Sequence, residues 1–351
     1  MKKTAFAPIL LLILMLTAGC AAATDKEAPD PSLKEEPTAA EEPAGPVSGG
    51  EEEIILNPES QWKLKGTLTL PDGAGPFPLA VLVHGMGIAD RDYSSGALKP
   101  FRDLAEFLAE QGIATIRYDK RLKTYHYQMI TDVDLTIYDE FVEDALAAAE
   151  LARTLERIDP AGIFLICHSL GGYMIPKIAE TDADNMIAGY IALAAPARPL
   201  QDMIMAMVET STLLKTMTAT QIADYKRPYL ESYELLKTLS ESDRGGQSAL
   251  LGYYPTYWLS LAGYDPLVEA ARLNKPLFFL QGGSDDLVAA DFTMWQAALN
   301  RYEKAEFKFY PALTHLFIDT AKIDASDREY YEGRLEYEVA VDIADFIRRN
   351  R

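Results

Sequence analysis

A short apolar segment that runs directly into a serine-containing turn is the feature that most constrains this chain. Residues 163–166 read Ile-Phe-Leu-Ile, and the next six residues read Cys-His-Ser-Leu-Gly-Gly. Small residues two positions either side of Ser169, namely Cys167 and Gly171, allow a strand to turn sharply into a helix and expose the serine hydroxyl. The usual pattern has glycine at both positions, and here cysteine replaces the first. The segment predicts a nucleophilic serine at a strand-to-helix turn.

Strand-like and helix-like patterns alternate along the chain from residue 62 onward. Short apolar runs indicate buried strands, and apolar residues at helical spacing indicate amphipathic helices. The predicted strands are 62–70, 79–83, 113–118, 163–166, 187–194, 276–280 and 307–310, and the predicted helices are 101–110, 137–155 and 339–349. This alternation favours an α/β domain with a mostly parallel central sheet flanked by helices. The first of these strands is expected to be antiparallel.

The alternation is interrupted between residues 198 and 263. Apolar residues at helical spacing occupy 203–214, and seven aromatic residues are spread over 225–258. We expect a helical cap insertion that covers the serine turn. Its methionine and aromatic side chains suit an acyl-binding pocket, and they equally suit simple packing of the cap onto the core.

A second functional turn is expected after the predicted strand at 79–83. The sequence there is His84-Gly85-Met86-Gly87. Acyl transfer requires preorganised N–H donors for a developing oxyanion, and the backbone N–H groups of Met86 and Leu170 are the candidates. The glycines allow the backbone to approach a substrate closely. His84 is expected to orient this turn and not to act as a base.

Together with further motifs, these segments resemble the carboxylesterase-like bacterial members of the α/β-hydrolase superfamily. The motifs lie at 83–87, 90–92, 100–105, 117–121, 257–259, 263–266 and 313–317. The resemblance extends over nearly the whole chain from residue 62. It implies the α/β-hydrolase fold, serine esterase activity, no cofactor, and a catalytic triad in the chain order serine, acid, histidine.

That chain order leaves a single candidate for the general base. Of four histidines, only His315 follows Ser169, and it lies just beyond the predicted strand at 307–310. Asp285 and Asp286 compete for the role of the acid that stabilises the imidazolium. We prefer Asp285, because the segment Gly-x-x-Asp-x-x-Val at 282–288 resembles the acid loop of many α/β-hydrolases.

Three charged residues follow the predicted strand at 113–118. Asp119, Lys120 and Arg121 are expected to form a structural ion pair beneath the oxyanion turn, with Arg91 or Asp90 as a partner. No catalytic role is assigned to them.

The expected reaction is hydrolysis of carboxylic esters with small or medium acyl chains through an acyl-enzyme intermediate. Peptidases, amidases and acyltransferases use the same machinery, and the sequence leaves these alternatives open. A function of another class is also open, namely a non-catalytic envelope lipoprotein that binds an apolar ligand in a hydrolase-shaped pocket.

The first residues indicate a targeting segment. Two lysines precede an apolar run that is too short to span a membrane, and Thr-Ala-Gly-Cys follows at 17–20. This resembles a bacterial lipobox, which implies a signal peptide at 1–19 and a lipid on Cys20. The alternative is an ordinary secretory signal cleaved after a nearby alanine. In either case we expect an exported protein of the cell envelope, with the lipid holding it at the outer face of a membrane or in the periplasm.

The segment that follows is rich in Pro, Glu and Ala. Residues 20–53 contain almost no large apolar side chains, so we expect a disordered acidic tether there and the hydrolase domain at 54–351.

Composition excludes several function classes. The formal net charge is −20, from 33 basic and 53 acidic residues, and it argues against nucleic-acid partners because phosphate neutralisation requires clustered lysine and arginine. With Cys20 lipidated, Cys167 has no disulfide partner. The sequence has no His/Cys spacing typical of metal sites and no glycine-rich phosphate loop. The expected partners are therefore a small ester substrate and a membrane, with no metal or cofactor.

Overall fold

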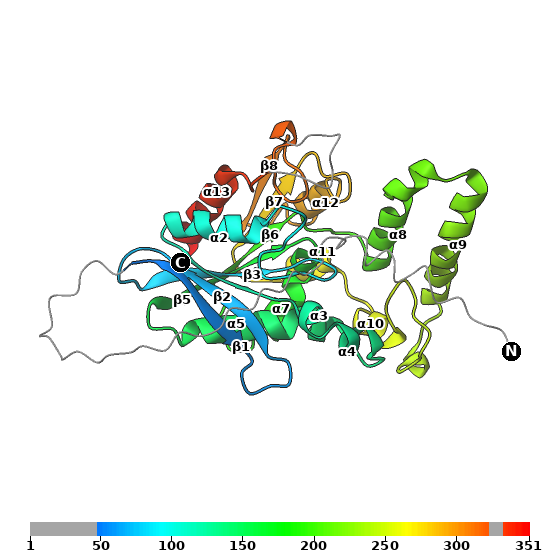
Figure 1. The fold of residues 1–351 in the computed structure, drawn as a ribbon, viewed down its shortest axis with the longest axis horizontal. Helices are drawn as coiled ribbons and strands as arrows, with labels where there is room; N and C mark the ends of the chain where they lie inside the picture. Colours follow the sequence, from blue (N-terminus) through cyan, green and yellow to red (C-terminus); the bar gives the residue numbers. More distant parts are fainter. Residues whose placement is uncertain (1–47, 323–332) are drawn as a thin grey trace, which may run out of the picture.

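The chain folds around one twisted β-sheet in the computed structural model, which describes residues 48–322 and 333–351 (Figure 1). The sheet has eight strands in the order β1-β2-β4-β3-β5-β6-β7-β8. The strands are β1 (Gly50–Leu56), β2 (Leu64–Leu70), β3 (Phe77–Val83), β4 (Ala114–Tyr118), β5 (Ile158–His168), β6 (Gly189–Leu193), β7 (Leu277–Gly282) and β8 (Ala305–Tyr310). β1 and β2 pair antiparallel, and β2 pairs antiparallel with β4. All pairs from β4 to β8 are parallel.

The central strands end level with one another. Val83 of β3 pairs with Cys167 of β5, and Cys167 pairs with Ala192 of β6. Because the carboxyl ends of parallel strands meet at one edge of the sheet, this register brings the turn after β3 beside the turn after β5. The two turns that the sequence singled out are therefore neighbours.

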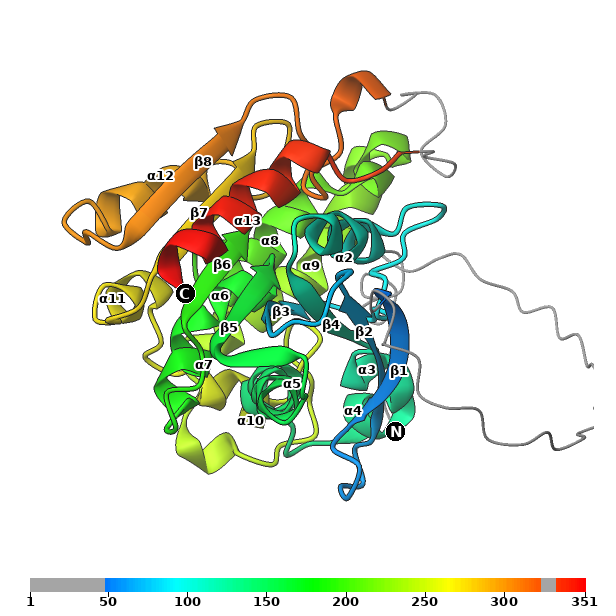
Figure 2. The same ribbon diagram turned by 90° about the vertical axis from the view of Figure 1, so that its left-hand side faces the viewer.

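Helices cover both faces of the sheet (Figure 2). They are α2 (Pro100–Glu110), α3 (Arg121–Thr124), α4 (His126–Thr131), α5 (Glu143–Arg153), α6 (Leu170–Tyr173), α7 (Ile175–Thr181), α8 (Leu200–Thr210), α9 (Ala219–Leu236), α10 (Pro255–Ser260), α11 (Pro266–Ala270), α12 (Asp291–Ala298) and α13 (Tyr337–Asn350). α2 and α13 pack on one face, and α5 packs on the other. The expected α/β architecture with a mostly parallel sheet is confirmed.

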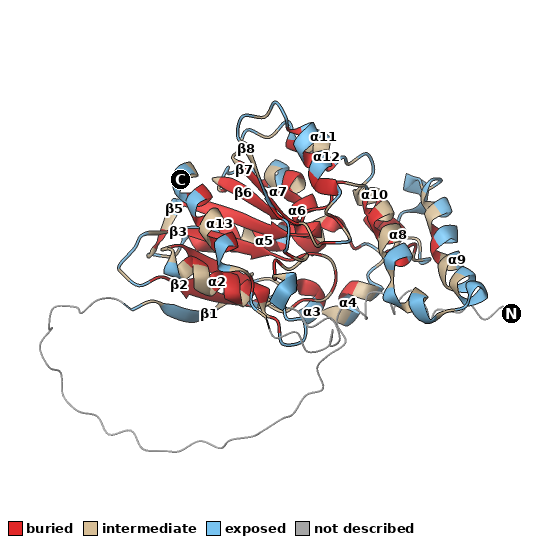
Figure 3. Ribbon diagram, turned by 90° about the horizontal axis from the view of Figure 1, so that it is seen from above, coloured by how far each residue is buried: buried red, intermediate tan, exposed pale blue. Residues whose placement is uncertain are grey.

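Each face of the sheet has its own core because strand side chains alternate in direction. Leu82 and Ile166 pack with α2 and α13 residues such as Phe101 and Phe346. Val81 and Leu165 pack with residues of α5 on the opposite face. Buried residues accordingly fill the sheet and the inner sides of its helices, while much of α9 is exposed (Figure 3).

The segment expected to form a cap is helical. Residues 198–263 contain α8, α9 and α10 with two short 3-10 turns, η2 (Thr212–Thr216) and η3 (Glu241–Asp243). α8 and α9 project from the body of the domain (Figure 1). Thr218 begins α9 with a reciprocal capping interaction with Gln221, which satisfies backbone donors at the helix start.

Two boundaries differ from the sequence-based expectation. β1 begins at Gly50, so residues 50–53, which we had placed in the tether, are a strand of the domain paired with β2. Charged side chains are tolerated there because β1 is an edge strand. The helix expected at 137–155 is continuous from residue 137 to residue 153, but its first turn, η1 (Tyr138–Val142), is π-helical and precedes α5.

The N-terminal predictions fall on residues that the structure does not describe. The signal peptide, Cys20 and the tether up to residue 47 all lie outside the described ranges. Within those ranges, no helix combines the length and the apolar character needed to cross a membrane.

Candidate active site

Ser169 stands at the turn between β5 and α6 in a strained backbone conformation. Its φ of 52° and ψ of −122° lie in a backbone region that residues other than glycine rarely adopt. The surrounding hydrogen bonds hold it there, because its N–H donates to the Leu193 carbonyl and its own carbonyl accepts from Gly172, both at 2.8 Å. The chain is thus forced to project this hydroxyl from the end of the strand.

Close packing between the two turns explains the small residues around Ser169. A Cβ atom on Gly171 would lie 2.5 Å from the His84 carbonyl oxygen, and one on Gly85 would lie 2.8 Å from the Ser169 Cβ. Neither separation is possible without movement of the backbone. Cys167 takes the place of the usual glycine, and its side chain is fully buried in the core that also contains the residues of α5. Burial raises the pKa of its thiol, which therefore stays protonated.

His315 and Asp285 form a hydrogen-bonded pair. The distance from His315 Nδ1 to Asp285 Oδ2 is 2.7 Å, and the Asp285 side chain is 1% exposed. Asp286, the competing candidate, is exposed. Burial opposes the charged form of Asp285, but hydrogen bonds from His315, Gln281 and the Leu287 N–H outweigh it and lower the pKa of Asp285 to about 2. A carboxylate is therefore present behind the imidazole.

The residue just before Ser169 connects it to the loop that bears His315. The Nε2–H of His168 donates to the His315 carbonyl at 2.9 Å, and its Nδ1 accepts from the Tyr93 hydroxyl at 3.2 Å. The two imidazole rings are 4.6 Å apart. Burial, followed by the charge of His315, lowers the pKa of His168 to about 3. A neutral His168 thus fixes His315 beside the serine turn, a role that the sequence analysis missed.

Two atoms of this group are left without partners. Neither Ser169 Oγ nor His315 Nε2 makes a hydrogen bond to any residue in the described ranges. Hydrogen bonds between nucleophile and base are often long in ligand-free enzymes and tighten when substrate binds. Both atoms are therefore free to form hydrogen bonds with a substrate.

The candidate oxyanion donors are also free. Within the described part of the chain, the N–H groups of Met86 and Leu170 have no hydrogen-bond acceptor. Leu170 is the first residue of α6, where helix geometry provides no acceptor for its N–H. Two backbone donors beside a serine hydroxyl are the arrangement that stabilises a tetrahedral oxyanion.

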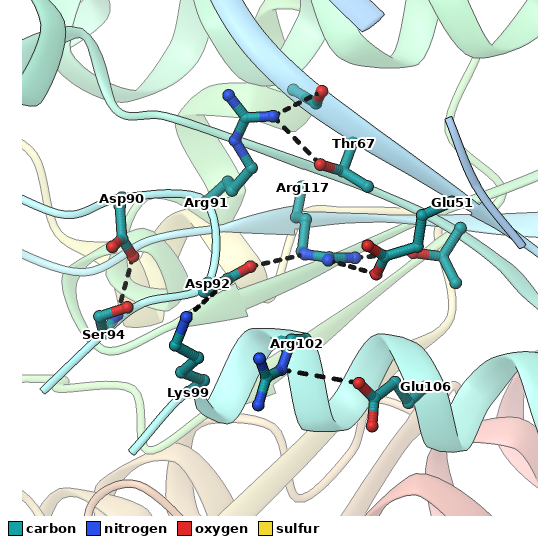
Figure 4. Close-up of polar contacts among 12 residues, drawn as sticks. Glu51, Thr67, Asp90, Arg91, Asp92, Ser94, Lys99, Arg102, Glu106 and Arg117 are labelled. Carbon is teal, nitrogen blue, oxygen red and sulfur yellow. Dashed lines mark hydrogen bonds and ion pairs between the residues drawn. The ribbon is translucent and has the colours of Figure 1, made fainter. Parts of the chain in front are cut away.

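His84 supports the turn that contains Met86, as its position in the sequence suggested. Its Nε2–H donates to the Asp90 carbonyl at 2.8 Å. Burial, followed by the charge of Lys120, lowers the pKa of His84 to about 4. The Asp90 side chain in turn accepts a hydrogen bond from the Ser94 N–H within the same loop (Figure 4).

Arginine side chains tie the same loop to the sheet. Arg91 pairs with Asp119 at 3.0 Å, as expected, and donates to the Gly66 carbonyl of β2. Arg117 of β4 holds Asp92 at 3.0 Å (Figure 4). The loop after Gly87 is thereby tied to β2 and β4 through its two neighbouring residues Arg91 and Asp92.

A cavity of about 720 Å³ opens between the cap and the acid loop. Met207 and Leu214 of the cap line it together with Asp286 and Leu287. These last two follow Asp285 in the acid loop, whereas Ser169, Asp285 and His315 themselves do not line this cavity. Among residues 48–322 and 333–351, no group of three or more His, Cys, Asp or Glu side chains could hold a metal ion.

Comparison with known proteins identifies the family. The family model described as "Serine aminopeptidase, S33" matches residues 76–320, which is most of the chain. The chain belongs to this family of α/β-hydrolases. Its match begins just before β3 and ends after His315, so it includes both turns and the acid loop of the candidate site.

A curated protein gives a second likeness. The chain is 32% identical over 274 residues to "Esterase EstD" of Thermotoga maritima, and the aligned part is 78% of this chain and 61% of that protein. This chain therefore spans less than two thirds of the length of that relative.

Solved structures share the fold of this hydrolase. The Pyrococcus furiosus esterase PF2001 matches with a TM-score of 0.53 and 16% identity, over 86% of this chain and 91% of that one. Est1E from Butyrivibrio proteoclasticus matches with a TM-score of 0.51 and 17% identity, over 85% and 98% of the two chains. At such identities the likeness concerns the fold alone.

Proposed function

We propose that this protein is a serine hydrolase that cleaves carboxylic esters of small or medium acyl chains. The main support is the hydrogen bond between buried Asp285 and half-buried His315, which His168 holds beside the strained Ser169 turn. Its relative in Thermotoga maritima is named an esterase, and that name agrees with the proposal.

The reaction follows from the roles that these atoms can take. The Ser169 hydroxyl attacks the ester carbonyl while His315 Nε2 accepts its proton, and Asp285 stabilises the resulting imidazolium. The Met86 and Leu170 N–H groups hold the oxyanion. His315 then protonates the leaving alcohol, and a water molecule repeats the sequence on the acyl-enzyme to release the acid.

Hydrolysis of p-nitrophenyl butyrate by Ser169→Ala tests this proposal. We expect kcat to fall by about 10³-fold or more, because the nucleophile is lost, while the melting temperature stays close to that of the wild type. Unchanged turnover in the folded variant would remove Ser169 from the mechanism.

Amide cleavage is the second candidate, and two observations favour it. The family description names an aminopeptidase, and Asp286 and Glu209 line the cavity beside the acid loop, where they can receive a substrate amine. An aminoacyl p-nitroanilide compared with p-nitrophenyl butyrate separates the two. A higher kcat/KM on the anilide would replace the esterase proposal with a peptidase.

Export and lipid anchoring are also proposed, from the targeting segment that ends at Cys20. Expression in a bacterial host fed an alkyne-tagged palmitate tests this. We expect membrane-associated, tagged protein from the wild type and no tag on Cys20→Ser. A tag that persists in the variant would exclude Cys20 as the attachment point.

A further inference from the structure

We propose that Lys120 is a positioning residue for the oxyanion hole and acts through the peptide group between Gly85 and Met86. The inference rests on the proposed ester hydrolysis, because it assigns Met86 N–H the task of holding the oxyanion. Lys120 itself does not touch the substrate.

Lys120 is buried directly behind the oxyanion turn. Its Nζ donates to the Gly85 carbonyl oxygen at 2.8 Å, and its own backbone N–H donates to the Ala89 carbonyl at 3.0 Å. The side chain is 3% exposed. Lys120 therefore forms hydrogen bonds to both ends of the turn, at Gly85 and at Ala89.

The contact with Gly85 determines the direction of the next N–H. The carbonyl of Gly85 and the N–H of Met86 belong to one planar peptide group, and in a trans peptide they point in opposite directions. An ammonium group that holds the carbonyl on the inner side therefore turns the N–H toward Ser169. Polarisation of the carbonyl also strengthens the N–H as a donor, because linked hydrogen bonds reinforce each other.

A buried carboxylate keeps the ammonium in place. Glu140 Oε1 accepts from Lys120 Nζ at 2.6 Å, and the Glu140 side chain is 2% exposed. Its second oxygen accepts from the Tyr257 hydroxyl of cap helix α10 at 2.7 Å. Burial lowers the pKa of Lys120, and the charge of Glu140 opposes this. Glu140 lies in the π-helical turn η1, and π turns are frequent at functional sites.

A purely structural ion pair is the competing explanation, since buried pairs can often be replaced without loss of stability. The next residue provides a matched control. Arg121 is equally buried and pairs with Asp144 at 2.6 Å, and both side chains are 2% exposed. Arg121 makes no contact with Gly85, so its pair can support the fold but cannot orient the Met86 N–H.

The test compares Lys120→Met/Glu140→Gln with Arg121→Met/Asp144→Asn. Each double variant removes both members of its buried pair, and the other partners of Arg121, Glu143 and Asp139, are 55% and 33% exposed, so neither variant leaves an unpaired charge in the core. The probe is an alkyl trifluoromethyl ketone. Ser169 Oγ adds to the ketone carbon, the hydroxyl proton passes to His315, and the carbonyl electron pair moves onto the oxygen, so that no group leaves. The ¹⁹F NMR shift of this hemiketal, followed against pH, gives the pKa of the oxygen that occupies the oxyanion hole.

We expect the hemiketal pKa to rise by about one unit or more in Lys120→Met/Glu140→Gln, and kcat for p-nitrophenyl butyrate to fall roughly 10- to 100-fold with little change in KM. In the Arg121→Met/Asp144→Asn variant the hemiketal pKa stays at the wild-type value, even if the melting temperature falls. Lys120→Gln, which retains a neutral donor, gives an intermediate hemiketal pKa and serves as the second variant if the double variant does not fold.

Two results would overturn the inference, and they are distinguishable. If the hemiketal of a folded Lys120 variant ionises at the wild-type pH, Lys120 does not tune the oxyanion hole, and the esterase proposal stands. If the wild type itself forms no hemiketal, the proposed function fails and this inference fails with it.

Discussion

The hydroxyl of Ser169 is placed by a backbone conformation that hydrogen bonds and close packing maintain together. Its positive φ is held by hydrogen bonds to Leu193 of β6 and to Gly172 of α6, and glycines at 85 and 171 allow the two turns to touch. Strain of this kind persists only where the surroundings over-determine it. The position of the Ser169 hydroxyl therefore depends on the packing around it.

Gly171→Ala tests that packing. The added methyl group would lie 2.5 Å from the His84 carbonyl oxygen, so we expect a loss of about 1–3 kcal/mol in the free energy of unfolding and a clear fall in kcat. Gly112→Ala is the control, because its φ of 78° is strained but nothing lies within 4 Å of the added atom. Urea denaturation and ester kinetics measure both effects. An equal loss of activity in the two variants would show that the activity does not depend on the close packing at Gly171.

His168→Phe tests the link between the serine turn and the base. Phenylalanine fills a similar volume but cannot donate to the His315 carbonyl, so we expect kcat to fall roughly 10- to 100-fold with little change in KM. His168→Gln keeps an N–H donor and should recover part of that loss. Identical kinetics for the two variants would argue that the contact at 2.9 Å does not position His315.

At the scale of elements, local patterns predicted the sheet, the two turns and the helical nature of the cap. Apolar runs and helical spacing are set by residues close together in the chain, so the core strands and α13 were found within a few residues of their ends. Contacts between distant segments were not accessible in this way. His168 meets His315 across 147 residues, and the sequence around either one gives no sign of it.

Two element-level misses have the same origin. The acidic composition of residues 50–53 concealed a strand whose stability comes from pairing with β2 and from Arg117, which binds Glu51. The π turn η1 lies within a helix that the sequence predicted as regular. Glu140 lies in this turn and accepts hydrogen bonds from both Lys120 and Tyr257, contacts that a local helical pattern does not reveal.

The cap provides a prediction about acyl length. Leu214 lines the cavity of about 720 Å³ that adjoins the acid loop, and Leu214→Trp would narrow it. If acyl chains enter this cavity, we expect kcat/KM to fall for p-nitrophenyl octanoate and to change little for the acetate, because the shorter chain does not reach the cap. A uniform change across a series of acyl lengths would place the acyl group elsewhere.

For the whole molecule, the buried titratable groups of the site predict sensitivity to acid. The pKa values of His84 and His168 are lowered from 6.5 to about 4 and about 3. As the pH falls, these two histidines therefore become protonated in the unfolded chain at a higher pH than in the folded chain. Their contribution to stability is complete above pH 6.5 and is lost progressively down to those lower values. Asp285, lowered from 3.8 to about 2, acts in the same direction between those two values.

We therefore expect the free energy of unfolding to fall by several kcal/mol between about pH 7 and pH 4. Urea denaturation at a series of pH values measures this. His84→Asn retains a donor for the Asp90 carbonyl but cannot titrate, so its stability should depend less steeply on pH than that of the wild type. A wild-type stability that is flat over this range would contradict the assignment of neutral, buried histidines.

The central claim is that Ser169 is an activated nucleophile, and a fluorophosphonate probe tests it most directly. We expect the folded wild type to be labelled, with the label mapped by mass spectrometry to the peptide that contains Ser169, and the folded Ser169→Ala variant to remain unlabelled. A folded wild type that takes no label, or a label that persists in Ser169→Ala, would contradict the claim. The first of these results would favour a non-catalytic binding protein built on the same fold.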